Sequence, residues 1–356
     1  MATDTNRKMQ HMTSDGRPRR LDLDRSIDDE ILLRTVPGAV DYLFEELRTF
    51  SGAEVRVVAR RRDALQLSYR GTLRPLAAIR YFDTAAICLY PDPDRRVRES
   101  TERGVLAALT GDSPQIQFRV GDLGEARWDI RDQFEADPHW HNSAGNWDIN
   151  VVDSPGGLVG EVGELYLTER FGALLRAPAS TNPVIGAVMV RLAKIEDGQT
   201  VLDPFCGAGT LLVLAGEMAK PGLLIGGDVQ SSWARAARTN VHSRGLDGSL
   251  LNVDAQRLPF PNGSIDRIIA NMPFGKRVGT HKHNIQMYPA ALGEISRVMT
   301  PRGRAVLLTE DKRLFRETVQ RTPLLRVIKE ILLERGGAHP SAYVVVKRGN
   351  SRAVQR

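Results

Sequence analysis

The sequence has few cysteines and no long apolar run. Its 356 residues include only Cys88 and Cys206, too few for a disulfide framework or a cysteine-rich zinc site. No stretch approaches the roughly 20 apolar residues that span a membrane, and the first residues lack the apolar segment of a secretory signal. We therefore expect a reduced, cytoplasmic protein that holds no metal and enters no membrane.

Charge is modest overall but divided along the chain. The formal net charge is +6, from 49 Lys and Arg against 43 Asp and Glu. Residues 1–170 carry 23 basic and 29 acidic residues, a net −6, whereas residues 171–356 carry 26 and 14, a net +12. An anionic partner is expected to contact mainly the second half.

Pattern and composition divide the chain into five parts. A polar arm (1–30) precedes an α+β, ferredoxin-like unit (31–95) and a less regular module (96–170). From Thr200 strands and helices alternate, which predicts a doubly wound, mostly parallel sheet, with an antiparallel pair at 325–333 and 343–347. This α/β domain covers 171–348, and 349–356 form a polar tail.

The first strand of the α/β domain ends in a glycine-rich turn, Asp203-Pro-Phe-Cys-Gly-Ala-Gly-Thr210. Leu211-Leu212 replaces the third glycine of a dinucleotide site, and the Gly-Lys-Ser/Thr ending of a P-loop is missing. An acid before the glycines would repel a pyrophosphate but suits a cationic ligand. S-adenosylmethionine, with its amine and sulfonium, fits that requirement.

Acidic residues also end the next two strands. Asp228 is placed to accept two ribose hydroxyls, and Asp254 could accept from an adenine amino group. The alternative is that each aspartate merely caps the following helix. Three acids and a glycine turn at successive strand ends favour the cofactor site. Its predicted residues are Asp203, Pro204, Cys206, Gly207, Gly209, Thr210, Asp228, Val229, Asp254 and Ala255.

The fourth strand ends in Asn271-Met272-Pro273-Phe274. The Asn271 side chain and the Met272 carbonyl could accept the N–H bonds of an exocyclic amine, and so direct its lone pair at a methyl donor. Pro273 stiffens the loop and Phe274 can stack on a flat base. These four residues are the predicted catalytic residues, and Asn271 also borders the predicted cofactor site. The alternative is an ordinary proline turn.

Together these motifs resemble the THUMP-associated RNA guanosine-N2 methyltransferases, which are class I, S-adenosylmethionine-dependent enzymes. The resemblance covers about 176–347, and Asn271-Met-Pro-Phe-Gly-Lys-Arg277 is similar to the subgroup that modifies the tRNA acceptor stem at or near position 6. Arg176-Ala-Pro-Ala-Ser-Thr-Asn-Pro183 resembles the family segment that closes over the methionine end of the cofactor. This implies a cofactor contact for Asn182.

The same resemblance suggests an RNA substrate. It identifies 96–170 as a shortened or diverged THUMP-like domain, which in the family holds the tRNA 3′ end together with the ferredoxin-like unit. Expected RNA contacts are Lys276, Arg277, Lys282 and Arg176. tRNA is the expected partner, rRNA remains open, and a monomer is favoured. Alternatives are an adenine-N6 or protein-glutamine methyltransferase and a non-catalytic RNA-binding subunit.

Overall fold

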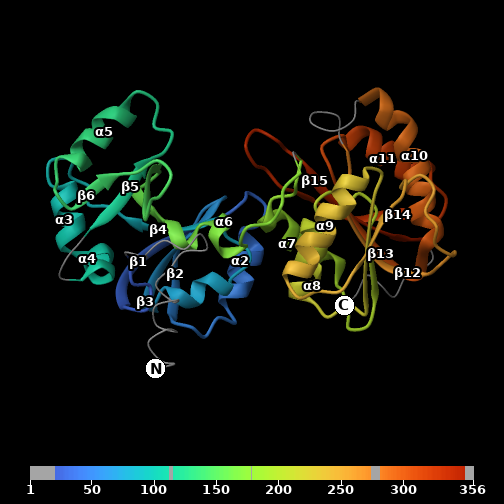
Figure 1. Ribbon diagram of the computed structural model, residues 1–356, viewed down its shortest axis with the longest axis horizontal. Helices are drawn as coiled ribbons and strands as arrows, with labels where there is room; N and C mark the ends of the chain where they lie inside the picture. Colours follow the sequence, from blue (N-terminus) through green and yellow to red (C-terminus); the bar gives the residue numbers. More distant parts are fainter. Residues whose placement is uncertain (1–20, 112–114, 178, 274–280, 349–356) are drawn as a thin grey trace. The chain divides into compact units, whose positions relative to one another are not determined.

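The computed structural model describes residues 21–111, 115–177, 179–273 and 281–348, with 281–283 described by their helical backbone alone (Figure 1). The chain divides into two compact units, the first up to residue 173 and the second from Leu174, which also includes 36–38. Within the described ranges, no helix combines the length and apolar character that a membrane crossing requires.

The first unit is built on one eight-stranded sheet, ordered β2-β3-β1-β4-β8-β7-β5-β6. Pairing is antiparallel from β2 through β7 and parallel among β7, β5 and β6. Helix α2 packs on β3, α4 on β1, and α5 on β5 and β6. The bounds are β1 Ser26–Arg34, α2 Val40–Leu47, β2 Glu54–Arg60, β3 Ala64–Thr72, η1 Arg74–Ala78, β4 Thr84–Cys88, α3 Arg96–Glu102, α4 Gly104–Thr110, β5 Ile116–Val120, α5 Ala126–Glu135, β6 Trp140–Asn142, β7 Ile149–Ser154, β8 Gly157–Val162, η2 Gly163–Leu165 and α6 Leu167–Arg170.

The predicted boundary between arm and first domain at residue 30 is wrong. Strand β1 already begins at Ser26, and Leu21 and Leu23 before it are buried. The acidic residues from Asp28 to Glu30 make this strand hard to recognise in the sequence. In the structure, β3 supplies hydrogen-bond donors to two of them. Arg70 on β3 donates to Asp28, and Gln66 on β3 donates to Glu30.

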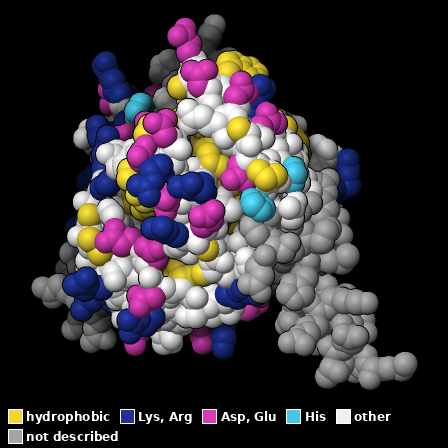
Figure 2. Space-filling view, turned by 90° about the vertical axis from the view of Figure 1, so that its left-hand side faces the viewer, with side chains coloured by type: hydrophobic (Ala, Val, Ile, Leu, Met, Phe, Trp, Pro, Cys, Tyr) yellow, Lys and Arg dark blue, Asp and Glu magenta, His cyan; other side chains and the backbone are white. Residues whose placement is uncertain are grey.

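The regions predicted as 31–95 and 96–170 share this sheet. Strand β4, from the first region, pairs antiparallel with β8, from the second. Their assignment as ferredoxin-like and THUMP-like modules stays a prediction. Side chains of both signs intermingle on the face shown in Figure 2, which looks from the side on which α3 and α5 lie in Figure 1.

The second unit carries a seven-stranded sheet, ordered β11-β10-β9-β12-β13-β15-β14. The first five strands are parallel, and β15 runs antiparallel between β13 and β14. The predicted parallel sheet and its antiparallel pair are therefore confirmed. The bounds are α7 Pro183–Ala193, β9 Thr200–Asp203, α8 Thr210–Met218, β10 Leu223–Asp228, α9 Ser231–Ser243, β11 Ser249–Asn252, β12 Ile265–Asn271, α10 His281–Val298, β13 Met299–Thr309, α11 Lys312–Arg321, β14 Leu325–Leu332 and β15 Ser341–Lys347.

Helices cover this sheet in two groups: α7, α8 and α9 pack side by side, and α10 packs with α11 (Figure 1). A core cluster joins the strands to α10 and α11, with Ile268, Leu307 and Phe315 fully buried in it. Because β9, β10 and β12 run parallel, their carboxyl ends meet at one edge of the sheet, where ligands bind in such folds.

Candidate active site

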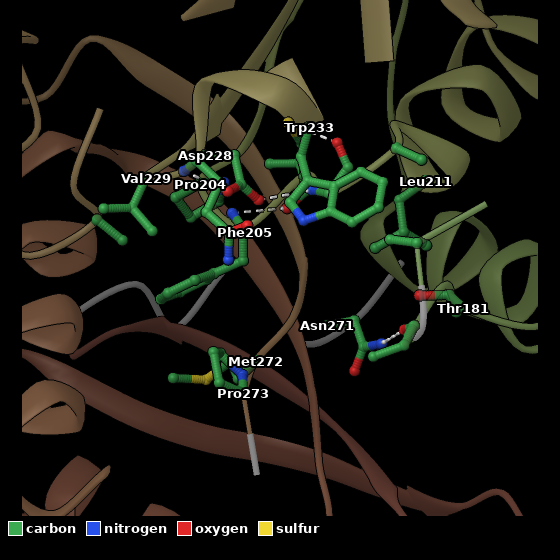
Figure 3. Close-up of a pocket in the computed structure, with 18 of the residues that line it drawn as sticks. Thr181, Pro204, Phe205, Leu211, Asp228, Val229, Trp233, Asn271, Met272 and Pro273 are labelled. Carbon is green, nitrogen blue, oxygen red and sulfur yellow. Dashed lines mark hydrogen bonds between the residues drawn. The ribbon is translucent and has the colours of Figure 1, made fainter. Parts of the chain in front are cut away.

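A cavity of about 450 Å³ lies at this edge (Figure 3). It is lined mostly by carbon, with a few polar groups, as ligand sites commonly are. The lining comes from segments far apart in the sequence, namely 177 and 179–181, 203–211, 228–233, 254–256 and 271–273, together with Met287 of α10.

The glycine loop between β9 and α8 follows the wall of the cavity. Gly207 and Gly209 have φ values of 48° and 82°, a region that favours glycine. A Cβ on Gly209 would lie 3.1 Å from Ala237, so the loop also packs closely on α9. The Gly207 N–H donates to Asp228 at 3.0 Å, and the Cys206 N–H donates to the Gly227 carbonyl. The loop is thus fastened to the end of β10.

Asp203 lies at the bottom of the site with 1% of its surface exposed. Burial raises its pKa to about 8; the hydrogen bond from the Phe205 N–H opposes the rise and the Asp228 charge adds to it. A carboxylate in such surroundings is stabilised by a cation next to it. Burial also raises the pKa of the Cys206 thiol, which argues against a reactive cysteine here.

The predicted alternative, that the aspartates cap helices, is wrong. Asp203 accepts from Phe205 in the loop, not from α8. Asp228 accepts from Gly207 and Gln230, and α9 has no side-chain cap. Asp254 is exposed and accepts from the Gln256 N–H, before a turn. All three line the cavity.

Two asparagines hold the segment that contains Leu175 and Ala179 and precedes the glycine loop in the sequence. Asn240 of α9 is 2% exposed; its Nδ2 donates to the carbonyls of Leu175 and Ala208, and its Oδ1 accepts from the Leu175 N–H. This ties the segment to the glycine loop. Farther along, the Nδ2 of Asn271 donates to the Ala179 carbonyl at 3.2 Å.

That bond fixes the orientation of the Asn271 amide. Because Nδ2 is engaged by a carbonyl, the other end of the amide is the oxygen. Oδ1 is buried, and none of the residues that the structure describes donates a hydrogen bond to it. Unpartnered buried acceptors are rare and costly, so each one calls for an explanation. Asn271 lines the cavity, and Oδ1 is therefore available to a donor on a ligand (Figure 3).

The loop after Asn271 is anchored on both sides. The Met272 N–H donates to the Leu308 carbonyl at 2.9 Å, which extends the pairing of β12 with β13 by one residue. The Pro273 carbonyl accepts from the hydroxyl of Tyr288 on α10 at 2.8 Å. Both residues line the cavity.

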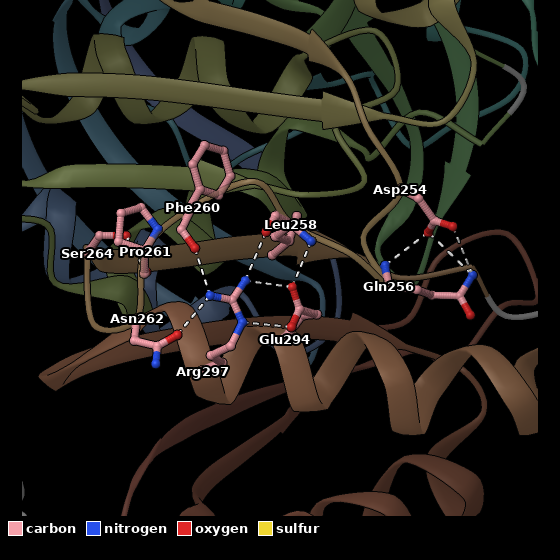
Figure 4. Close-up of polar contacts among 9 residues, drawn as sticks. All are labelled: Asp254, Gln256, Leu258, Phe260, Pro261, Asn262, Ser264, Glu294 and Arg297. Carbon is pink, nitrogen blue, oxygen red and sulfur yellow. Dashed lines mark hydrogen bonds and ion pairs between the residues drawn. The ribbon is translucent and has the colours of Figure 1, made fainter.

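Helix α10 also anchors the loop after β11 (Figure 4). The Arg297 guanidinium donates to the carbonyls of Leu258 and Phe260 and to Asn262, while Glu294 accepts from the Leu258 N–H. The two side chains also pair at 2.7 Å. This network holds the segment that begins with Asp254.

The structure places most predicted site residues in the cavity but not all. Asn182 is outside its lining and caps α7, accepting from Val184 and Ile185. Gly209 is also outside the lining, and its positive φ shapes the glycine loop. Arg176 is exposed and outside the lining too. Phe274, Lys276 and Arg277 lie outside the described residues, as does the Lys282 side chain. All these assignments stay predictions.

Several lining residues escaped the sequence reasoning. Trp233, in the first turn of α9, projects its indole into the cavity from the Asp228 side (Figure 3). An aromatic residue soon after a strand-end acid was the available signal. Met287 reaches the site only through tertiary packing, and no local pattern marks it. Residues 179–181 belong to the segment 176–183, which the resemblance had already placed near the cofactor.

Comparison with known proteins places this second unit. Residues 174–340 match the family model described as RMKL-like, methyltransferase domain. The bovine (Bos taurus) tRNA (guanine(6)-N(2))-methyltransferase THUMP3 is 31% identical over 189 residues, 49% of this chain and 37% of the relative. The chain therefore spans well under half of that relative's length.

Two further comparisons extend beyond this unit. The tRNA (guanine(6)-N2)-methyltransferase of Thermus thermophilus is 29% identical over 260 residues, 72% of this chain and 68% of the relative. The crystal structure of TrmN from Thermus thermophilus superposes with a TM-score of 0.67 at 25% identity, covering 89% of this chain and 99% of that one. The predicted class I, Rossmann-like methyltransferase fold is confirmed, and residues 174–340 of this chain are similar to the RMKL-like methyltransferase domains.

Proposed function

We propose that this protein is an S-adenosylmethionine-dependent RNA methyltransferase that methylates the exocyclic N2 of a guanosine, in tRNA. The observation that carries the proposal is the buried Oδ1 of Asn271, an acceptor in the cavity that receives no hydrogen bond from the described part of the chain. The names of the bovine and Thermus relatives, both tRNA guanine-N2 methyltransferases, support the choice of base and RNA.

The residues around the cavity fit the cofactor. Asp203 would lie at its cationic end, the Asp228 carboxylate would accept from the ribose hydroxyls, and Asp254 would accept from the adenine amino group. The Trp233 indole adds a flat apolar surface. When bound, the cofactor supplies an electrophilic methyl group.

The chain's own contribution to transfer is positioning. Asn271 Oδ1 accepts one N–H of the target amine, and the Met272 carbonyl accepts the other. Two acceptors in fixed places turn the nitrogen lone pair toward the methyl donor. The Ala179 carbonyl prevents the Asn271 amide from presenting its NH₂ to the amine instead.

The finer substrate assignment rests on resemblance. We place the target in the acceptor stem at or near position 6, and we propose that the first unit holds the tRNA 3′ end through its ferredoxin-like and THUMP-like regions. The similarity to TrmN across 89% of the chain supports this use of both units.

The test is methyl transfer from labelled cofactor to transcribed tRNA and rRNA fragments, followed by nucleoside analysis. We expect N2-methylguanosine from tRNA, lost when the guanosine at position 6 is changed to adenosine. N6-methyladenosine without N2-methylguanosine would refute the base assignment, and labelling of rRNA alone would refute the RNA assignment.

A further inference from the structure

A chain of hydrogen bonds runs from the turn after β13 to the loop that follows Asn271. The Tyr288 hydroxyl lies 2.8 Å from the Pro273 carbonyl and 2.8 Å from Thr309 Oγ1. The N–H of Asp311 donates to the same Thr309 oxygen at 3.0 Å. The side chains of Tyr288 and Thr309 are fully buried.

The available protons determine which group donates and which accepts in each of these hydrogen bonds. The Pro273 carbonyl can only accept, so the single Tyr288 proton goes to it. Tyr288 must then accept from the Thr309 hydroxyl, which itself accepts from the Asp311 N–H. Burial raises the pKa of Tyr288, so the hydroxyl keeps its proton. Each member is both polarised and oriented by the one before it.

This series of hydrogen bonds ends at Pro273, in the catalytic loop that follows Asn271. Pro273 lacks an N–H, so its carbonyl is the only backbone polar group through which it can be held. On its other side, the Met272 N–H is tied to Leu308, the neighbour of Thr309. The loop is therefore held at two successive residues by the end of β13 and by α10.

From this geometry we propose that Tyr288 and Thr309 are positioning residues for methyl transfer. They keep the Asn271 side chain and the Met272 carbonyl in the positions that the target amine requires. The inference rests on the proposed function.

The test compares four variants of the full chain with wild type in single-turnover methyl transfer and in calorimetric cofactor binding. Tyr288→Phe and Thr309→Val each remove one link and should slow transfer about tenfold while the cofactor Kd stays within about twofold. Thr309→Ser keeps the hydroxyl and should transfer at nearly the wild-type rate. Because the links act as a unit, the double variant should lose no more than Tyr288→Phe alone.

Tyr69→Phe is the matched control, because it removes a buried tyrosine bond to the Thr72 carbonyl in the first unit. It should leave the rate unchanged. A wild-type rate for Tyr288→Phe, or equal loss in Thr309→Ser and Thr309→Val, would overturn the proposal. If Tyr288→Phe fails to fold, the Thr309 pair decides.

Two readouts separate this inference from the proposed function. The ratio of variant to wild-type rates holds for any methylated nucleoside, so a different product would refute only the function. If wild type methylates no RNA, hydrogen exchange decides without substrate. The Met272 amide should exchange faster in Tyr288→Phe than in wild type or Tyr69→Phe, and unchanged exchange would refute the positioning role.

Discussion

Two residues of the cavity are arranged at a cost to the folded state. Asn271 keeps a buried oxygen to which no described residue donates, and Asp203 keeps a carboxyl group almost fully out of water. Each arrangement destabilises the empty protein. A ligand that donates to the first and carries positive charge near the second would relieve both, so each can be tested by removing one group.

Asp203→Asn should stabilise the protein increasingly as pH rises. The pKa of Asp203 is raised to about 8 from an ordinary 3.8, so the folded state binds this proton more tightly than the unfolded state does. Stability therefore falls as pH rises through that window. Without cofactor, the Tm gain of the variant should be small at pH 5 and several degrees at pH 9. An equal gain at both values would contradict the burial argument.

The same substitution should weaken cofactor binding, because the negative charge next to the cationic end is lost. Calorimetry at pH 8 should show a Kd at least about tenfold higher than wild type, although the variant is the more stable protein. A gain in stability with loss of binding separates a functional carboxylate from a merely structural one.

Asn271→Ala should reduce methyl transfer roughly a hundredfold or more, because both the lone-pair orientation and the fixed acceptor are lost. The cofactor Kd should change by no more than about threefold. The measurement is single-turnover transfer at saturating cofactor. Persistence of the wild-type rate would mean that the acceptor role assigned to Asn271 is wrong.

Residue identity predicted the acids, the glycine turn and Asn271, because each follows a strand end and parallel strand ends converge. It could not predict what Asn182 does. An asparagine before a proline fits a cofactor contact as well as a helix cap; the bonds to Val184 and Ile185 show the cap, and the cofactor contact stays a prediction. Nor could sequence show that Tyr288 reaches Pro273, since that contact depends on how α10 packs.

At the scale of elements, α10 supports both halves of the site. Its Tyr288 holds the catalytic loop, and two turns later Glu294 and Arg297 hold the segment after β11 (Figure 4). A shift of this helix would disturb the substrate and cofactor sides together, although Met287 alone among its described side chains lines the cavity.

Arg297→Ala should therefore weaken cofactor binding, although Arg297 is not among the residues that line the cavity. Loss of its bonds to Leu258, Phe260 and Asn262 frees the segment that begins at Asp254, and the Kd should rise about five- to tenfold. Arg313→Ala is the control, because that arginine is 92% exposed and pairs with Glu317 on the same helix. Equal Kd values for both variants would refute the anchoring role.

On the scale of the whole molecule, charge and fold divide at the same place. The second unit begins at Leu174, close to where the sequence changes from a net −6 to a net +12. RNA contacts should concentrate in the basic half. Because charges of both signs intermingle on the face in Figure 2, we expect any RNA contact there to depend on a local group of side chains.

RNA affinity should fall steeply with salt, and the slope should depend on the basic half. The double reversal Lys276→Glu with Arg277→Glu should weaken binding and flatten the salt dependence. Arg61→Glu with Arg62→Glu, in the turn between β2 and β3, is the matched pair and should change affinity little. Filter binding from 50 to 300 mM salt measures both. A larger loss of RNA affinity from the Arg61 and Arg62 reversals would contradict the expectation that RNA contacts concentrate in the basic half.

In the second unit, sequence reasoning predicted the alternation of strands and helices because buried parallel strands leave continuous apolar runs. It fared worse in the first unit. Three of the nine residues of strand β1 are acidic, and the strand is stabilised by cross-strand partners such as Arg70, a contact no local window contains. The pairing of β4 with β8 is likewise invisible locally, and it makes one sheet where composition indicated two modules.

That single sheet has a consequence for synthesis on the ribosome. Strand β4 ends at Cys88, but its partner β8 begins at Gly157, about 70 residues later. At a translation rate of roughly 5–20 residues per second, the edge of β4 waits about 4–14 s for its partner. During that interval the nascent chain presents an open strand edge, a template for wrong pairing. The acidic half of this protein thus has a period of vulnerability that its finished fold no longer reveals.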